Sequence, residues 1–135
     1  MGRSHRVAWL CFLLQVGALA LLAGCDSSER NADSLPQRWQ NLDVRVESRP
    51  SPPAMGMNEF LVIITGAHGA PVWDCRVNIR TSEADPWKQS IEDGRVGVYR
   101  RAALVEAGQR SVLQVQLRCQ GDETVLRFPL NLTAH

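Results

Sequence analysis

Histidine, lysine and an excess of charge of either sign are scarce in this sequence. Only His68 and His135 lie beyond residue 25, so that part of a single copy has too few imidazoles for a multi-histidine metal site. The 15 Lys and Arg residues nearly balance the 14 Asp and Glu residues, and Lys88 is the only lysine. Nucleic-acid-binding proteins usually carry a basic patch or stripe, so we expect no nucleic-acid partner.

Catalytic motifs are missing as well. The sequence has no G-x-S-x-G elbow, phosphate-binding glycine loop, zinc-binding His pair or Cys/His nucleophile pattern. Acidic residues in its polar segments, such as Asp85 and Glu92, are expected to be solvated. We therefore expect a protein that is not an enzyme. With 135 residues and 44% hydrophobic content, the chain has room for one folded domain besides a targeting segment.

The first 25 residues have the pattern of an export signal. Basic Arg3 and Arg6 precede an apolar run over residues 7–23, which is shorter than the roughly 20 residues of a spanning helix. The run ends in Leu-Leu-Ala-Gly-Cys (residues 21–25), which resembles the bacterial lipobox. This resemblance implies cleavage before Cys25, attachment of diacylglycerol to its thiol and acylation of the new amino terminus, for example by palmitate. The alternative is an ordinary thiol that follows a simple signal peptide or a short anchor helix.

Two or three acyl chains would hold the protein stably on a membrane. Asp26 resembles the signal that retains some lipoproteins in the inner membrane, so we expect a lipid-anchored protein on the periplasmic face of a bacterial membrane, with the inner membrane favoured. Residues 1–24 would be the lipoprotein signal peptide. Residues 25–41 would be the lipidated cysteine and a flexible polar tether, and residues 42–135 the folded domain.

From residue 42 onward, apolar and polar residues alternate as they do in half-buried strands. Turn-forming Gly, Pro and Asp residues separate six candidate strands, at residues 42–47, 58–65, 72–80, 96–101, 111–120 and 124–132. This pattern predicts an all-β immunoglobulin-like sandwich of two sheets with about six to seven strands, and a small barrel is the alternative. Residues 101–106 could form one helical turn. Pro129 indicates that the last strand lies at a sheet edge.

Two cysteines, Cys75 and Cys119, remain in the expected domain. Both lie on the apolar side of their candidate strands, and an exported protein folds in an oxidising compartment. We expect a disulfide between them, which would contribute about 4 kcal/mol in the chain-entropy model. A redox-active or metal-binding thiol pair is the alternative, although no C-x-x-C spacing supports it.

Three short motifs carry a resemblance to a known family. They are PAMGMNEF at residues 53–60, GAHGAPV at 66–72 and GRVGVY at 94–99. Together with the closing strands, they resemble the YtkA-like domain and, more loosely, the related FixH proteins, over residues 53–132. The resemblance implies a small immunoglobulin-like envelope domain, and some members are associated with copper handling or cytochrome oxidase assembly. Those members tend to carry Met- and His-rich stretches, whereas residues 80–91 here contain neither residue type.

Met55 and Met57, with His68 as a third ligand, form the only candidate copper site. Thioethers suit Cu(I), and imidazole suits copper generally. The strand at residues 58–65, about 25 Å long, would separate the methionines from the histidine. The alternative is that the methionines fill an edge of the core and that His68 is a solvated turn residue.

A partner protein in the envelope is expected to contact Trp87, Arg76 or Arg80. Trp87 follows a Pro in a polar loop and could anchor a partner, since aromatic residues concentrate at interface hot spots; alternatively, it folds back over the sandwich. The two arginines share an outward strand face, with Arg118 expected nearby. Trp73 is expected in the core. The sequence thus favours a non-catalytic accessory or binding protein that assists a membrane complex, with periplasmic copper handling as the alternative.

Overall fold

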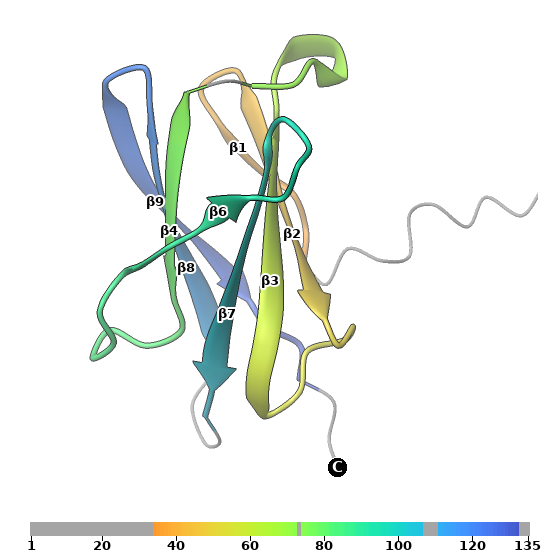
Figure 1. Cartoon of the computed structure of the whole chain (residues 1–135), viewed down its shortest axis with the longest axis vertical. Helices are drawn as coiled ribbons and strands as arrows, with labels where there is room; N and C mark the ends of the chain where they lie inside the picture. The colour runs from red at the N-terminus through yellow and green to blue at the C-terminus, as the bar shows by residue number, and fades with distance from the viewer. Residues whose placement is uncertain (1–33, 73, 107–110, 133–135) are drawn as a thin grey trace, which may run out of the picture.

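The computed structural model describes residues 34–72, 74–106 and 111–132, which form two antiparallel sheets packed face to face (Figure 1). Sheet A has the order β1 (Gln37–Trp39), β2 (Leu42–Arg49), β3 (Gly56–Thr65), β7 (Val98–Val105) and β6 (Ile91–Glu92). Sheet B has the order β5 (Lys88–Gln89), β4 (Cys75–Arg80), β8 (Val112–Cys119) and β9 (Asp122–Pro129). A short 3-10 turn, η1 (Ala67–Gly69), follows β3. The expected all-β sandwich is confirmed.

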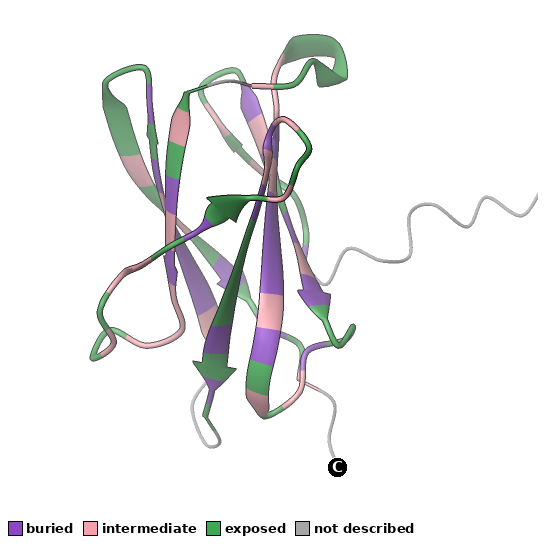
Figure 2. Cartoon of the chain, in the orientation of Figure 1, coloured by how far each residue is buried: buried purple, intermediate pink, exposed green. Residues whose placement is uncertain are grey.

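The core fills the space between the sheets, as the alternation of apolar residues predicts. In β2 every second residue is buried, and the same period brings apolar side chains inward from β3, β4 and β8 (Figure 2). The largest fully buried side chains are Phe60, Phe128, Ile64, Ile79, Leu113 and Leu117. Each such burial contributes about 1.5–3 kcal/mol before entropy is counted. Trp39 packs against the same core from its margin.

Strand boundaries differ from the expectation in two places. Gln37–Trp39 forms β1 and pairs with β2, although residues 25–41 were expected to be a tether, so the ordered domain begins before residue 42. The helical turn expected at residues 101–106 is wrong, because β7 continues to Val105, paired there with Gly56 of β3. The availability of a cross-strand partner decided the conformation of this segment. The edge position of β9, which ends at Pro129, is confirmed.

The two long sides of the sandwich are built differently. On one side, which we call the closed seam, a glutamine of β1 and one that directly follows β1 reach across to sheet B. Gln37 Nε2 donates to the Arg127 carbonyl oxygen at 2.5 Å, and Gln40 Nε2 donates to Asp122 Oδ2 at 3.1 Å. These bonds occupy polar groups along the otherwise unpaired edge of β9.

On the other side, the open seam, a five-residue crossing segment (residues 88–92) passes from sheet B to sheet A. Its first part, β5, pairs with Asn78 and Ile79 of β4, and the Ser90 amide donates to the Val77 carbonyl at 2.8 Å. Its last part, β6, pairs with β7. The segment therefore leaves the beginning of β4 without a strand neighbour on this side.

A glycine fixes the hairpin that follows the crossing segment. The Ile64 amide donates to the Gly97 carbonyl at 2.8 Å, which ties the hairpin to the end of β3. Gly97 has a positive φ of 78°, and a Cβ at this position would lie only 2.5 Å from the Ile64 carbonyl oxygen. Only glycine fits here without a shift of the backbone.

Candidate functional site: a cleft at the open seam

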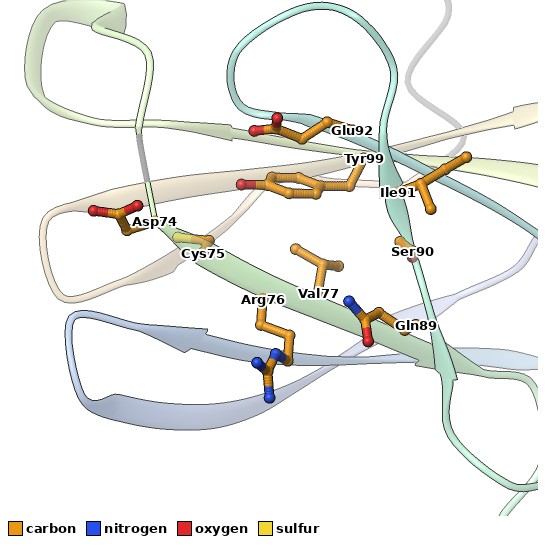
Figure 3. A pocket seen from close by; sticks show the side chains of 9 residues that line it. All are labelled: Asp74, Cys75, Arg76, Val77, Gln89, Ser90, Ile91, Glu92 and Tyr99. Carbon is orange, nitrogen blue, oxygen red and sulfur yellow. The ribbon is translucent and has the colours of Figure 1, made fainter.

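An open cleft of about 380 Å³ lies where the crossing segment leaves β4 uncovered. Its volume falls within the range of small-ligand sites. β4, the crossing segment and β7 supply its lining (Figure 3), which consists of Asp74, Cys75, Arg76, Val77, Gln89, Ser90, Ile91, Glu92 and Tyr99. Polar and apolar groups thus meet in one hollow between the two sheets.

Tyr99 lies at the centre of the cleft. Its ring extends from β7 toward β4, and the side chain is only 4% exposed. Burial is the main cause that raises the pKa of the Tyr99 hydroxyl above its ordinary value, and the negative charges of Glu92 and Asp74 raise it further. A hydrogen bond from the Cys75 backbone acts in the opposite direction. Tyr99 therefore connects sheet A to the free edge of sheet B.

Two exposed carboxylates, Asp74 and Glu92, flank the Tyr99 hydroxyl. Neither forms an ion pair with any residue in the described part of the chain, whereas Asp93, the neighbour of Glu92, binds Arg100 at 3.1 Å. Asp74 has a φ of 60°, a left-handed conformation that Asp tolerates better than most residues. The lining thus has two carboxylates against the single guanidinium of Arg76, and neither carboxylate is ion-paired within the described ranges.

Ser90 contributes a buried hydroxyl to the same cleft. The residue is 5% exposed, and its Oγ has no hydrogen-bond partner among the described residues. A buried polar atom without a partner costs about 1–3 kcal/mol, so such atoms are uncommon in native proteins. The side of the cleft formed by the crossing segment therefore has an unused donor and acceptor.

The expected disulfide between Cys75 and Cys119 is present. The two residues are direct cross-strand partners in β4 and β8, with their Cα atoms 4.4 Å apart, so the bridge lies within sheet B. Cys119 is buried and Cys75 is half-buried at the cleft. The disulfide thus fixes β4 where it lacks a neighbour on its other side.

Two of the residues expected to contact a partner are engaged with one another. The Arg80 guanidinium lies 4.4 Å from the centre of the Trp87 ring, and both side chains are half-buried. Arg80 also donates from Nε and Nη2 to Gln114 Oε1, at 3.0 and 2.9 Å. Trp87 therefore folds back over sheet B, which was the alternative to an exposed anchor.

Arg76, the third of these residues, is exposed and lines the cleft. Its cross-strand partner is Arg118, as its position on the outward face of β4 suggested. Arg118 binds Glu123, and this hydrogen bond is the main cause that holds the pKa of the Glu123 carboxyl below its usual range. Arg76 is thus the only one of the three expected contact residues that the structure brings to the cleft.

The candidate copper ligands lie apart. Met55 and Met57 are 55% and 63% exposed, so the expectation that they fill a core edge is wrong. His68 is exposed in η1, beyond the other end of β3. The eight residue steps from Met57 to Thr65 span about 26 Å of regular strand, so His68 does not join the methionines. Among the described residues, no group of three or more His, Cys, Asp and Glu side chains is placed to hold a metal.

Some predictions fall outside the described residues. These are the signal peptide, the lipid attachment at Cys25, the sorting residue Asp26 and the core position of Trp73. Within the described ranges, no helix is long and apolar enough to cross a membrane.

Three cleft residues, Tyr99, Ser90 and Glu92, were not singled out as a site from the sequence. Their proximity depends on the crossing of the chain between sheets, which no local pattern encodes. The only signal was that Tyr99 is the single tyrosine of the chain. The chain matches no family model, no curated protein and no solved structure.

Proposed function

We propose that this protein is a lipid-anchored, non-catalytic binding protein of the bacterial envelope, and that it contacts a partner protein through the cleft at the open seam. The observation that carries this proposal is the cleft itself, which combines two carboxylates and a buried hydroxyl that have, respectively, no ion-pair and no hydrogen-bond partner among the residues that the structure describes. The lipobox-like sequence that ends at Cys25 supports attachment to the periplasmic face of the inner membrane.

The architecture around the cleft supports recognition of a partner. The disulfide and the Tyr99 contact hold the walls in place, so little order need be gained on binding. Preorganised sites lose less conformational entropy on binding and therefore bind more tightly. The resemblance to YtkA-like proteins favours a partner that belongs to a membrane complex and a role in its assembly.

Site-specific crosslinking in intact cells tests the contact. A photoreactive residue in place of Gln89, which lies exposed at the cleft, should capture one defined envelope protein. The matched control is Asn41, which is exposed in the turn between β1 and β2 on the closed seam. Equal capture from both positions, or no capture at position 89, would contradict the proposal.

Substitution of the anchor tests the location. Cys25→Ser should abolish incorporation of labelled fatty acid and block lipoprotein-type cleavage, because serine has no thiol to receive the diacylglycerol. If this variant were processed and partitioned with membranes as the parent protein does, the lipid anchor would be excluded.

Copper handling is a second candidate because Met55 and Met57 are both exposed and only two residues apart. Titration of the protein with Cu(I) against a competing chelator tests it. Binding that is lost in the Met55→Leu, Met57→Leu double variant but kept in His68→Ala would establish a methionine site. The absence of competition with the chelator would reject this function.

A further inference from the structure

We propose that the cleft binds a protonated primary amine on an alkyl chain, as found in a lysine side chain or a free alkylamine. The assignment of this amine to a lysine of the partner protein rests on the proposed function. The preference of the cleft for a protonated amine does not rest on it. The argument uses the charge, the shape and the free hydrogen-bonding groups of the cleft.

Charge favours a cation at one end of the cleft. Asp74 and Glu92 lie at the end of the cleft toward which the Tyr99 hydroxyl points, and they have no ion-pair partner in the described ranges. The only cationic residue in the lining is Arg76, and its guanidinium lies on the far side of β4 from both carboxylates (Figure 3). An anion placed between the carboxylates would be repelled, and a bound ammonium would compensate them.

The number of acceptors fits an ammonium group. A primary ammonium has three N–H donors and no acceptor. The two carboxylates and the oxygen of the Tyr99 hydroxyl offer acceptors at the same end of the cleft. Hydrogen bonds between ionised partners are about twice as strong as neutral ones, so this end gives the ligand its orientation.

The rest of the cleft fits an alkyl stem with a polar group at its other end. In the view of Figure 3, Ser90 lies on the opposite side of the Tyr99 ring from the hydroxyl, and Val77 lies between. The buried ring and the buried Val77 form the apolar floor between the carboxylates and Ser90. The unpartnered Ser90 Oγ is placed to bind a second polar group, such as a peptide carbonyl or amide at the base of a lysine side chain.

The test is an NMR titration of the full mature protein, isotope-labelled and held in detergent micelles. The first probe is Nα-acetyl-lysine N-methylamide, and its Nε-acetylated form is the uncharged control with the same stem. A third probe, 1,5-diaminopentane, represents a free amine. Both amines should shift the amide signals of Ser90 and Glu92, and the acetylated probe should not. Equal shifts with the acetylated probe would overturn the proposal.

Two charge variants locate the binding. Asp74→Asn and Glu92→Gln should each weaken binding of both amines about tenfold, the loss expected for one charge-assisted hydrogen bond. Asp74→Asn keeps a residue that tolerates a positive φ. Asp93→Asn is the matched control, because it removes the same charge one residue away from Glu92 and outside the cleft lining. Unchanged affinity in both cleft variants, or an equal loss in Asp93→Asn, would overturn the proposal.

Ser90→Ala separates the two sources of the amine. It should weaken binding of the lysine probe more than that of 1,5-diaminopentane if the peptide group contacts Ser90. A larger loss for 1,5-diaminopentane would show that Ser90 accepts from the second ammonium of a free diamine and would overturn the assignment to a lysine side chain. The variant should also fold at least as stably as the parent, because the lost hydroxyl has no partner. If none of the three cleft substitutions changes the affinity for either amine, the amine site is excluded. If the amines bind as expected but no crosslink forms at position 89, only the proposed contact with a partner protein is rejected.

Discussion

The closed seam and the open seam join the same two sheets, but the edge of sheet B is covered at the first and partly uncovered at the second. At the closed seam, the side chains of Gln37 and Gln40 reach the edge of sheet B and occupy its polar groups. At the open seam, a crossing segment of five residues is too short to cover the whole of β4, and the Tyr99 hydroxyl reaches the uncovered part at the Cys75 backbone. A sandwich acquires a cleft where its edge is only partly covered.

Charge compensation differs between the outer faces of the sheets and the cleft at the open seam. Several carboxylates on the outer faces are paired, as Glu59 is with Arg49 and Glu123 with Arg118. At the cleft, Asp74 and Glu92 have no such partners in the described part of the chain. Exposed ion pairs contribute little stability, so the distinction concerns what the surface can bind rather than how stably the domain folds.

Removal of the disulfide should cause the largest loss of stability and should affect the open seam more than the closed seam. The Cys75→Ala, Cys119→Ala double variant removes a link that closes a loop with a sequence separation of 44, so urea unfolding should show a loss of about 4 kcal/mol. Hydrogen exchange should accelerate more at the beginning of β4 than in β2, because only the open seam depends on the link. Equal acceleration in the two strands would contradict the contrast between the seams.

Gly97→Ala should have the next largest effect. The new methyl group would meet the Ile64 carbonyl oxygen and would require an unfavourable positive φ, so we expect a loss of about 3 kcal/mol in urea unfolding. Gly94→Ala is the control within the same hairpin. It has a positive φ but no atom within 4 Å of the new Cβ, so its loss should be about 1 kcal/mol. Similar losses for the two variants would show that the close contact with β3 is unimportant.

Tyr99→Phe and Gln37→Ala compare one bridging hydrogen bond from each seam. Loss of the Tyr99 hydroxyl leaves the Cys75 backbone without its partner next to the core and should cost about 1–2 kcal/mol. Loss of the exposed Gln37 bond should cost less than about 0.5 kcal/mol. Chemical denaturation of both variants measures the difference, and a larger loss for Gln37→Ala would reverse our assignment of the more important bridge.

Ionisation of Tyr99 should show the smallest effect. Its pKa is raised, so between the ordinary value of about 10 and the raised value the unfolded chain loses the phenolic proton while the folded chain keeps it. The free energy of unfolding should therefore fall as pH rises above about 10. The change of absorbance near 295 nm with pH reports this residue alone, since the chain has one tyrosine and its tryptophans do not ionise in this range. Glu92→Gln should lower the pKa and Asp93→Asn should not; the same shift in both would show that net charge, not the cleft, is responsible.

Much of the fold was predictable because alternation is a local property. The candidate strands at residues 58–65 and 111–120 contain the central parts of β3 and β8, and the inward phase of Cys75 and Cys119 predicted their disulfide. The two-residue strands β5 and β6 are too short to show any period. Arg101 to Val105 continues as strand because β3 provides a partner, and this depends on tertiary pairing rather than on local propensity.

The candidate site was less predictable. Arg76 was singled out by its outward phase, and it does line the cleft. Arg80 and Trp87 shared the same signals of charge and aromaticity, but they contact each other. Neighbouring residues of one type can differ in pairing: Glu92 and Asp93 are adjacent, yet of the two only Asp93 forms an ion pair in the described part of the chain, with Arg100 across the same hairpin.

The position of β1 has a mechanical consequence. This three-residue strand is the outermost strand of sheet A and lies nearest to the N-terminal side of the chain, so a pulling force from that side would act on β1 first. The force would detach its few hydrogen bonds one after another, together with the contact of Gln37 with β9. Release of residues 34–41 would free a segment that spans at most about 27 Å when extended, while the disulfide and the core stayed in place. Under tension, the domain would thus release a short segment of chain before its core began to unfold.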